Sequence, residues 1–187
     1  MLVMITSCTK SDEVAPTTNT DPKAGSKWVY VTKTYNEAGA ITSTTTQTYI
    51  GVEVTVAGSK WISTVDQATS IASSALQKRT DGWWYIPGGS NTSSLWFKYP
   101  ALVNESYTYV FGTCMVKDIN ASVVVPAGTF NGCYYVQGHD TNSLEDEFWF
   151  TNSGAVLVYF NTYDQRVVGP ASNVYKKRST ELVSYTP

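Results

Sequence analysis

The chain has 187 residues, a formal net charge of −2 and a charged fraction of 15%. This balance excludes the strongly basic surface of a nucleic-acid-binding protein, and a hydrophobic fraction of 42% excludes global disorder. No apolar run approaches the roughly 20 residues of a membrane-spanning helix, and the 44 Thr and Ser residues, with many Tyr and Val, favour one β-rich domain.

The first eight residues predict a lipid anchor. Met1–Ser7 is mostly apolar, ends on a small residue and is followed by Cys8, which resembles the end of a bacterial lipoprotein signal, where the cysteine is lipidated. The apolar stretch is shorter than the roughly 7–15 residues that a signal needs. We therefore interpret residues 1–8 as a truncated signal whose true start lies upstream. The alternative is a chance apolar terminus with a free or buried thiol.

Residues 9–24 are predicted to form a flexible tether, because they hold two prolines, four threonines and few apolar residues. Within them, Lys10–Glu13 resembles the charged signals that direct Bacteroidetes-type lipoproteins to the outer leaflet, although a solvated linker has the same composition. The expected location is the outer membrane or the cell surface, with the lipid on Cys8 as the membrane contact. A periplasm-facing orientation is the alternative.

From Lys27 onward, short alternating runs are separated by turn residues, which predicts an all-β chain of hairpins. Turn signals lie at Asn36–Gly39, at Ala57–Ser59 and at Asp81-Gly82. The expected strands are Lys27–Tyr35, Ile41–Ile50, Val52–Val56, Lys60–Val65, Trp83–Ile86, Leu95–Tyr99, Tyr107–Lys117, Ser122–Val125, Cys133–Gln137, Glu147–Thr151, Ala155–Tyr159 and Thr180–Tyr185.

The segment near residues 66–78 departs from this pattern. Its apolar residues are spaced as on one face of a helix, with Asp66 as a candidate N-cap, whereas its serines favour a strand. The apolar residues in question are Ala68, Ile71, Ala72, Ala75 and Leu76. A short helix near residues 66–78 is therefore one expectation, and a further strand is the other.

Val123–Val125 predicts a central strand, because three β-branched residues in a row indicate burial on both faces. Pro126 cannot donate to a ladder, so the strand should end there. This interpretation makes Val124 a buried residue.

Cys114 and Cys133 are the remaining cysteines. Export would permit a disulfide, but a turn near 118–121 and another at Ala127-Gly128 would place them two strands, about 9–10 Å, apart. Two buried thiols are then expected, with a disulfide as the alternative if a bulge or strand crossing intervenes.

A family resemblance rests on segments that occur in a set order: Trp28 with Tyr30, Asp81–Tyr85, Leu95–Pro100 with Asn104–Ser106, Val123–Phe130 and Glu181–Tyr185. Together they resemble Bacteroidetes-type secreted lipoproteins of unknown function, which have a lipocalin-like or half-open β-barrel similar in shape to Lol-type lipoprotein carriers. The resemblance implies a single antiparallel meander over residues 25–187 and brings no catalytic residues. Those lipoproteins usually carry glycine where Asn104 stands.

Few residues suggest catalysis or metal binding. His139 is the single histidine, in a Gly- and Asn-rich stretch without a nucleophile signature. The nearby acids Asp140, Glu145, Asp146 and Glu147 lack the spacing of a calcium loop and are expected to form a solvated patch. We therefore predict a protein that is not an enzyme and that has no catalytic residue, no metal site and no cofactor.

The aromatic residues carry the functional prediction. Trp83 and Trp84 are adjacent, so in a strand they point to opposite faces and one needs a cover. We expect a barrel that binds a small apolar or amphipathic ligand through Trp84, Tyr85, Trp96 and Trp149. The alternative is a surface adhesion or structural module that contacts glycan or protein through an exposed aromatic face.

Overall fold

The computed structural model describes residues 21–109, 112–139, 145–152, 156–165 and 174–187, so the predicted signal and most of the tether lie outside these ranges. Every regular element in them is a strand, and the all-β prediction is confirmed. The strands are β1 (Lys27–Tyr35), β2 (Ile41–Val56), β3 (Ser59–Asp66), β4 (Ala72–Arg79), β5 (Gly82–Pro87), β6 (Ser94–Lys98), β7 (Ser106–Tyr109), β8 (Gly112–Val125), β9 (Gly128–His139), β10 (Glu145–Phe150), β11 (Leu157–Gln165) and β12 (Val174–Thr186). The described ranges contain no helix long and apolar enough to cross a membrane.

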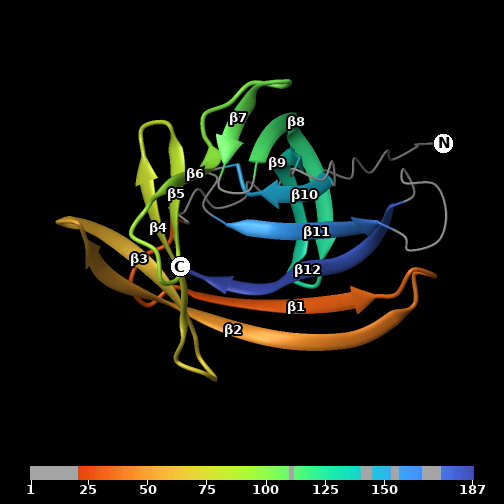
Figure 1. Cartoon of the computed structure of the whole chain (residues 1–187), viewed down its shortest axis with the longest axis horizontal. Helices are drawn as coiled ribbons and strands as arrows, with labels where there is room; N and C mark the ends of the chain where they lie inside the picture. The colour runs from red at the N-terminus through yellow and green to blue at the C-terminus, as the bar shows by residue number, and fades with distance from the viewer. Residues whose placement is uncertain (1–20, 110–111, 140–144, 153–155, 166–173) are drawn as a thin grey trace, which may run out of the picture.

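The strands form one antiparallel meander that curls into a nearly closed barrel, as predicted. Their order around the sheet is β6-β5-β4-β3-β2-β1-β12-β11-β10-β9-β8-β7. The first and last strands therefore pair, with Lys27 opposite Thr186 and Thr34 opposite Arg178. Figure 1 shows β1, β2, β11 and β12 as a long curved wall, with β3 to β6 at one end and β8 and β9 at the other.

The seam of the barrel lies between the edge strands β6 and β7, which are in contact but do not share a ladder. Side chains bridge it. The Tyr107 hydroxyl donates a hydrogen bond to the carbonyl oxygen of Trp96 at 3.3 Å, and the Lys98 ammonium lies 2.7 Å from the Glu105 carboxylate. The seam thus closes through side chains rather than through backbone pairing.

The helix considered for residues 66–78 is wrong, because this segment is a turn followed by β4. The Asp66 carboxylate does cap backbone N–H groups, accepting from Ala68 at 2.9 Å and from Thr69 at 3.0 Å. Ser70 then adopts a φ of 58°, which ends the turn instead of continuing it as a helix. Residues Ala72–Arg79 form a strand because they make backbone hydrogen bonds to β3 on one side and to β5 on the other, which outweighs their helical spacing.

The burial expected for Val124 is also wrong. β8 ends at Val125 before Pro126, as predicted, but the Val124 side chain is 77% exposed while Val125 is 6% exposed. The reason is the length of β7, which covers only the first part of β8 and reaches no further than Met115. The second half of β8 therefore has a ladder on one side only, and alternation turns Val124 to solvent.

The main core lies between β6 and the strands β8 to β12. Phe97, Val136 and Leu182 are fully buried there, and the rings of Phe97 and Phe150 lie 4.3 Å apart. A smaller cluster on the other face of β3 to β5 consists of Trp61, Ala75 and Ile86 with Trp84 packed on it. The tryptophan pair is thus split as predicted, with Trp83 in the main core.

Cys114 and Cys133 are free, buried thiols. The register predicted for them is wrong, because β8 runs unbroken and pairs directly with β9. Cys114 lies opposite Gly138 and Cys133 opposite Ala121. The five positions from Cys133 to Gly138 along β9 put the two cysteines about 16 Å apart, well beyond the reach of a disulfide.

Candidate functional site

A partly open cavity of about 210 Å³ lies on the inner side of the barrel, next to the main core. It is lined by residues from opposite walls of the barrel: Trp28, Tyr30, Tyr49, Thr64, Ser73, Ser74, Leu76, Tyr85, Trp96, Leu157 and Thr180. Alternation explains why β1 contributes Trp28 and Tyr30, since both point inward while Val29 points outward. The lining is mostly aromatic and aliphatic, which suits an apolar guest.

Tyr30 holds two walls of the cavity together. Its hydroxyl donates to the carbonyl oxygen of Leu157 at 3.0 Å, which links β1 to β11 across β12. Burial raises the pKa of Tyr30, with smaller contributions from Tyr49 and Tyr185. The Tyr30 side chain is nevertheless only partly buried, because it faces the space of the cavity.

Trp96 reaches the cavity because of a β-bulge. The register of β5 and β6 shifts so that Trp83 pairs with Phe97 and Trp84 with Leu95, which leaves Trp96 as the extra residue. Its ring packs edge-on against Phe150 at 5.2 Å and lies 6.1 Å from Tyr85. Trp96 therefore contacts both the cavity and the main core.

An open trough continues from the cavity along the inner face of β1, β2 and β12. The two spaces share Tyr30, Tyr49 and Thr180. The rest of the trough is polar and is lined by Thr32, Thr34, Ser43, Thr45, Gln47 and Arg178. Its hydroxyl groups interact across strands, with the side-chain oxygens of Thr32 and Thr180 3.1 Å apart. The inner face thus changes from apolar to polar along one continuous surface.

Of the four predicted site residues, Tyr85 and Trp96 line the cavity, while Trp84 and Trp149 do not. Trp84 lies on the other face of β5, where its indole N–H donates to Asp81 at 2.8 Å. The Arg79 guanidinium lies 4.2 Å from its ring centroid and covers that face of the ring. Trp84 is therefore held by its neighbours on the outside of the barrel.

Trp149 belongs to a ladder of rings across three strands. It stacks on Tyr135 of β9 with centroids 4.5 Å apart and an interplanar angle of 11°, and its centroid lies 5.1 Å from that of Tyr159 of β11, whose ring is tilted by 40°. These rings lie on the face of β10 opposite Phe148 and Phe150. Such contacts between side chains of neighbouring strands stabilise strand pairing.

Glu147 lies beside this ladder and is not the freely solvated acid that its sequence context predicted. Its carboxylate accepts hydrogen bonds from the Tyr135 hydroxyl at 2.7 Å, from the Asn161 side chain at 3.0 Å and from the Tyr163 hydroxyl. Burial raises the pKa of Glu147, but the hydrogen bonds outweigh this effect, so its pKa lies below the ordinary value. Burial and the Glu147 hydrogen bond together raise the pKa of Tyr163.

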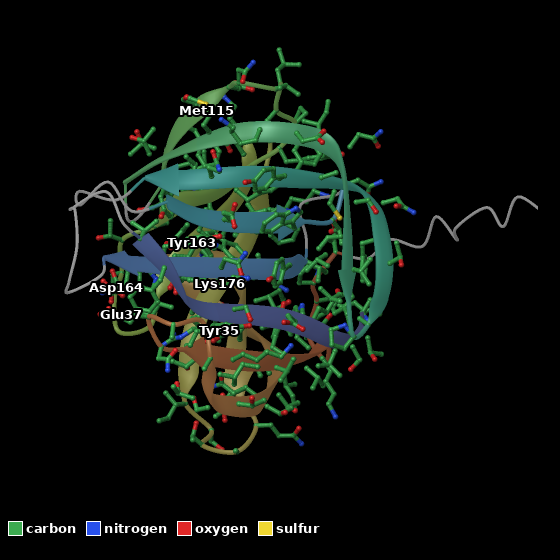
Figure 2. The ribbon with its side chains drawn as sticks, turned by 90° about the vertical axis from the view of Figure 1, so that its right-hand side faces the viewer. Tyr35, Glu37, Met115, Tyr163, Asp164 and Lys176 are labelled. Atoms are coloured by element: carbon green, nitrogen blue, oxygen red, sulfur yellow. The ribbon has the colours of Figure 1, made fainter. Side chains whose placement is uncertain are left out.

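Basic and aromatic side chains extend this outer face toward β1. Figure 2 shows Tyr163, Lys176 and Tyr35 one below another across β11, β12 and β1. The Lys176 ammonium lies 3.4 Å from the Tyr159 hydroxyl and 5.6 Å from the centroid of the Tyr35 ring. These contacts pair Lys176 with its neighbours, whereas the buried side-chain oxygen of Asn161, which lies in the Glu147 cluster, has no hydrogen-bond partner among the described residues.

The other residues discussed from the sequence lie away from the cavity or outside the described residues. His139 is the last residue of β9 and lies in register with Thr113 and Glu145, while Asp140 and Cys8 fall outside the described residues. In the part of the chain that is described, no three His, Cys, Asp or Glu side chains gather as metal ligands would.

Sequence reasoning missed most of the cavity lining. Trp28 and Tyr30 were noted as a strand pattern but not as site residues, and Tyr49 and Leu157 gave no signal on their own. A signal for the cavity was nevertheless present in the sequence: Trp28 and Tyr30 stand at alternate positions of the first strand, and the strand that follows is rich in threonine.

A scan against models of known protein families finds no match for this chain, and a search of the curated proteins finds none either. The geometry and chemistry of the cavity are therefore the basis for inferring a function.

Proposed function

We propose that this protein is a binding protein, not an enzyme, and that its barrel holds a small apolar or amphipathic ligand. The observation that carries the proposal is the internal cavity lined by Trp28, Tyr30, Tyr49, Tyr85 and Trp96. Aromatic rings contribute a large apolar area in a fixed geometry, and such linings are typical of ligand cavities. Aromatic, aliphatic and hydroxyl side chains such as these bind and orient a ligand, and we propose no chemical reaction in the cavity.

The alternative function is binding of glycan or protein at an exposed aromatic face. Ligand binding in the cavity is favoured over it because neighbouring side chains cover the rings on the outside of the barrel. One face of the Trp84 ring lies under Arg79, and Trp149 stacks on Tyr135 and contacts the tilted ring of Tyr159. A sugar ring stacks on an open aromatic face, which these arrangements occupy. Inside the barrel, by contrast, the rings border unfilled space.

We also propose that the barrel is held at the outer membrane or cell surface by a lipid on Cys8. The support comes from the Ile-Thr-Ser-Cys sequence and the polar tether that follows. The described chain begins at Asp21, whose carboxylate lies 2.6 Å from the Lys78 ammonium at the barrel wall. From Cys8 to that point the chain can extend at most about 45 Å, so the lipid would keep the barrel close to the membrane.

Tryptophan fluorescence tests the cavity directly. Wild-type protein, Trp96→Ala and the matched control Trp84→Ala are titrated with a fatty acid, a phospholipid and an oligosaccharide. We expect Trp96→Ala to weaken binding of the fatty acid or the phospholipid about tenfold, a loss of about 1.4 kcal/mol, while Trp84→Ala binds like the wild type. Native mass spectrometry of the purified protein should show the same ligand class bound.

Two results would overturn the proposal. One is an absence of saturable binding of any lipid by the wild-type protein. The other is oligosaccharide binding that Trp149→Ala abolishes and Trp96→Ala leaves intact, which would support the exposed aromatic face instead.

A further inference from the structure

The volume of the cavity restricts what can fill it. Cavities that enclose a whole drug-sized molecule measure about 300–1,000 Å³, whereas this one measures about 210 Å³. It therefore accommodates only part of such a ligand. The remaining part has to lie in the trough, because Tyr30, Tyr49 and Thr180 border both spaces.

The trough is suited to a polar group. Threonine, serine and glutamine side chains from β1 and β2 line it, and each offers donors and acceptors. A ligand that spans both spaces must then be apolar at one end and polar at the other. This requirement narrows the proposed function to amphipathic ligands.

The charge of the trough indicates the sign of the polar end. Of the described residues that line the cavity and the trough, none carries a carboxylate, and Arg178 is the one charged side chain. A guanidinium stays protonated at any physiological pH and forms paired hydrogen bonds with carboxylate or phosphate oxygens. The polar end is therefore expected to be an anion.

Alternation along β12 places Arg178 on the same face as Thr180, in the trough, and a bulge keeps Lys176 out of it. Thr162 of β11 pairs with Arg178, but the next residue, Tyr163, pairs with Lys176, so Lys177 is the extra residue. Lys176 consequently lies on the outer face against Tyr35, while Arg178 shares the inner face with Thr180. Without the bulge, alternation would place Lys176 and Arg178 on the same face.

The spacing along β12 sets the length of the ligand. Arg178 is four positions from Leu182, which lies opposite Tyr30 at the cavity. At about 3.3 Å per residue this separation is about 13 Å. An extended alkyl chain of medium length covers such a distance.

On these grounds we propose that the ligand is an anionic amphipath, with its apolar end among the rings of the cavity and its anionic head group bound by Arg178 in the trough. This inference rests on the proposed function and adds the ligand class and the residue that selects it. A carboxylate and a phosphate present the same oxygen geometry to the guanidinium, so the shared chemistry is that of an oxyanion.

The test compares probes that share a chain and differ in the head group. Dodecanoate, dodecyl phosphate, dodecanol and dodecyltrimethylammonium are titrated below their micelle concentrations, with tryptophan fluorescence as the readout. The variants are Arg178→Gln and, as the matched control, Lys177→Gln. The control removes the same charge from the neighbouring residue, which is exposed and lies 2.6 Å from Asp164.

We expect the wild-type protein to bind at least one of the two anions about tenfold more tightly than dodecanol, and the cationic probe most weakly. Arg178→Gln should reduce the affinity for that anion to that for dodecanol and leave dodecanol binding unchanged, whereas Lys177→Gln should change neither. A preference between dodecanoate and dodecyl phosphate then identifies the head group as carboxylate or phosphate.

Equal affinity of the wild type for dodecanol and both anions would overturn the inference. The same conclusion follows if Arg178→Gln and Lys177→Gln reduce anion affinity equally, because the effect would then be one of overall charge. In both cases the proposed function would still be supported if the wild-type protein binds dodecanol and Trp96→Ala weakens that binding. If no probe binds the wild-type protein, the proposed function and the inference both fail.

Discussion

Val124 and Val125 are neighbours on β8 whose side chains differ in exposed fraction, 77% against 6%. Substitution of each by aspartate is therefore a matched test of the strand's position at the edge of the sheet. At Val125 the change loses the burial of a valine side chain, about 1.5–3 kcal/mol. It also places an unpaired carboxyl group in the main core, which costs about 1–3 kcal/mol more when the group is protonated and neutral.

The free energy of unfolding is thus expected to fall by about 2.5–6 kcal/mol for Val125→Asp, a large part of the roughly 5–15 kcal/mol that holds a domain folded. For a domain of this size each kcal/mol lowers Tm by about 2–4 °C. Val124→Asp changes only strand propensity at a solvated position, so its cost should stay below about 1 kcal/mol.

Urea denaturation followed by circular dichroism measures both values. If Val125→Asp does not fold, Val125→Ala provides the comparison, with an expected loss of about 1.6 kcal/mol for two buried carbons. Equal losses for the two aspartate variants, or a larger loss at Val124, would refute the edge position of this part of β8.

Three further predictions follow from the same structure. Hydrogen bonds hold the pKa of Glu147 below its ordinary value, so its stabilisation is present above about pH 4.3 and is lost as the pH falls through the folded-state pKa. The difference in free energy of unfolding between wild type and Glu147→Gln should therefore be largest near pH 7 and shrink toward pH 3; a constant difference would contradict this. Burial raises the pKa of Cys114 to about 12 and of Cys133 to about 11, so in Cys8→Ala protein a thiol reagent should modify them only when the chain unfolds, as mass spectrometry would show. Expressed with a complete leader, the wild type should incorporate palmitate and fractionate with membranes, and Cys8→Ala should do neither; a labelled Cys8→Ala protein would rule out this anchor.

Local patterns predicted much of the fold. The expected limits of Lys27–Tyr35 match β1, because alternation there is uninterrupted and Asn36–Gly39 ends it. A turn separates β2 from β3 at Ala57-Gly58, where the sequence predicted one, and Gly82 has the positive φ that the Asp81-Gly82 signal favoured. Asn104, which stands where the resembling lipoproteins carry glycine, has a φ of 66°, a conformation that asparagine tolerates better than most residues.

Pairing between distant strands could not be read from local patterns. Whether residues 66–78 form a helix or a strand depends on the ladders that β3 and β5 offer, and the exposure of Val124 depends on where β7 ends. The bulge that brings Trp96 to the cavity and the bulge that turns Lys176 away from the trough leave no mark in the sequence. Nor does alternation alone say which face of a strand lies inside the barrel, so two of the four predicted site residues, Trp84 and Trp149, prove to lie on the outside.

The pairing of the first strand with the last has a consequence for how the barrel is made. Thr32 and Thr180 are neighbours in the sheet although 148 positions separate them in the chain. During synthesis β1 therefore has no partner on its β12 side until the C-terminal strand leaves the ribosome. Contacts between residues so far apart in the sequence slow folding. A circular permutant opened at the seam between β6 and β7, with the natural ends joined, would turn the same barrel into a meander in which every hydrogen-bonded neighbour follows its partner directly in sequence.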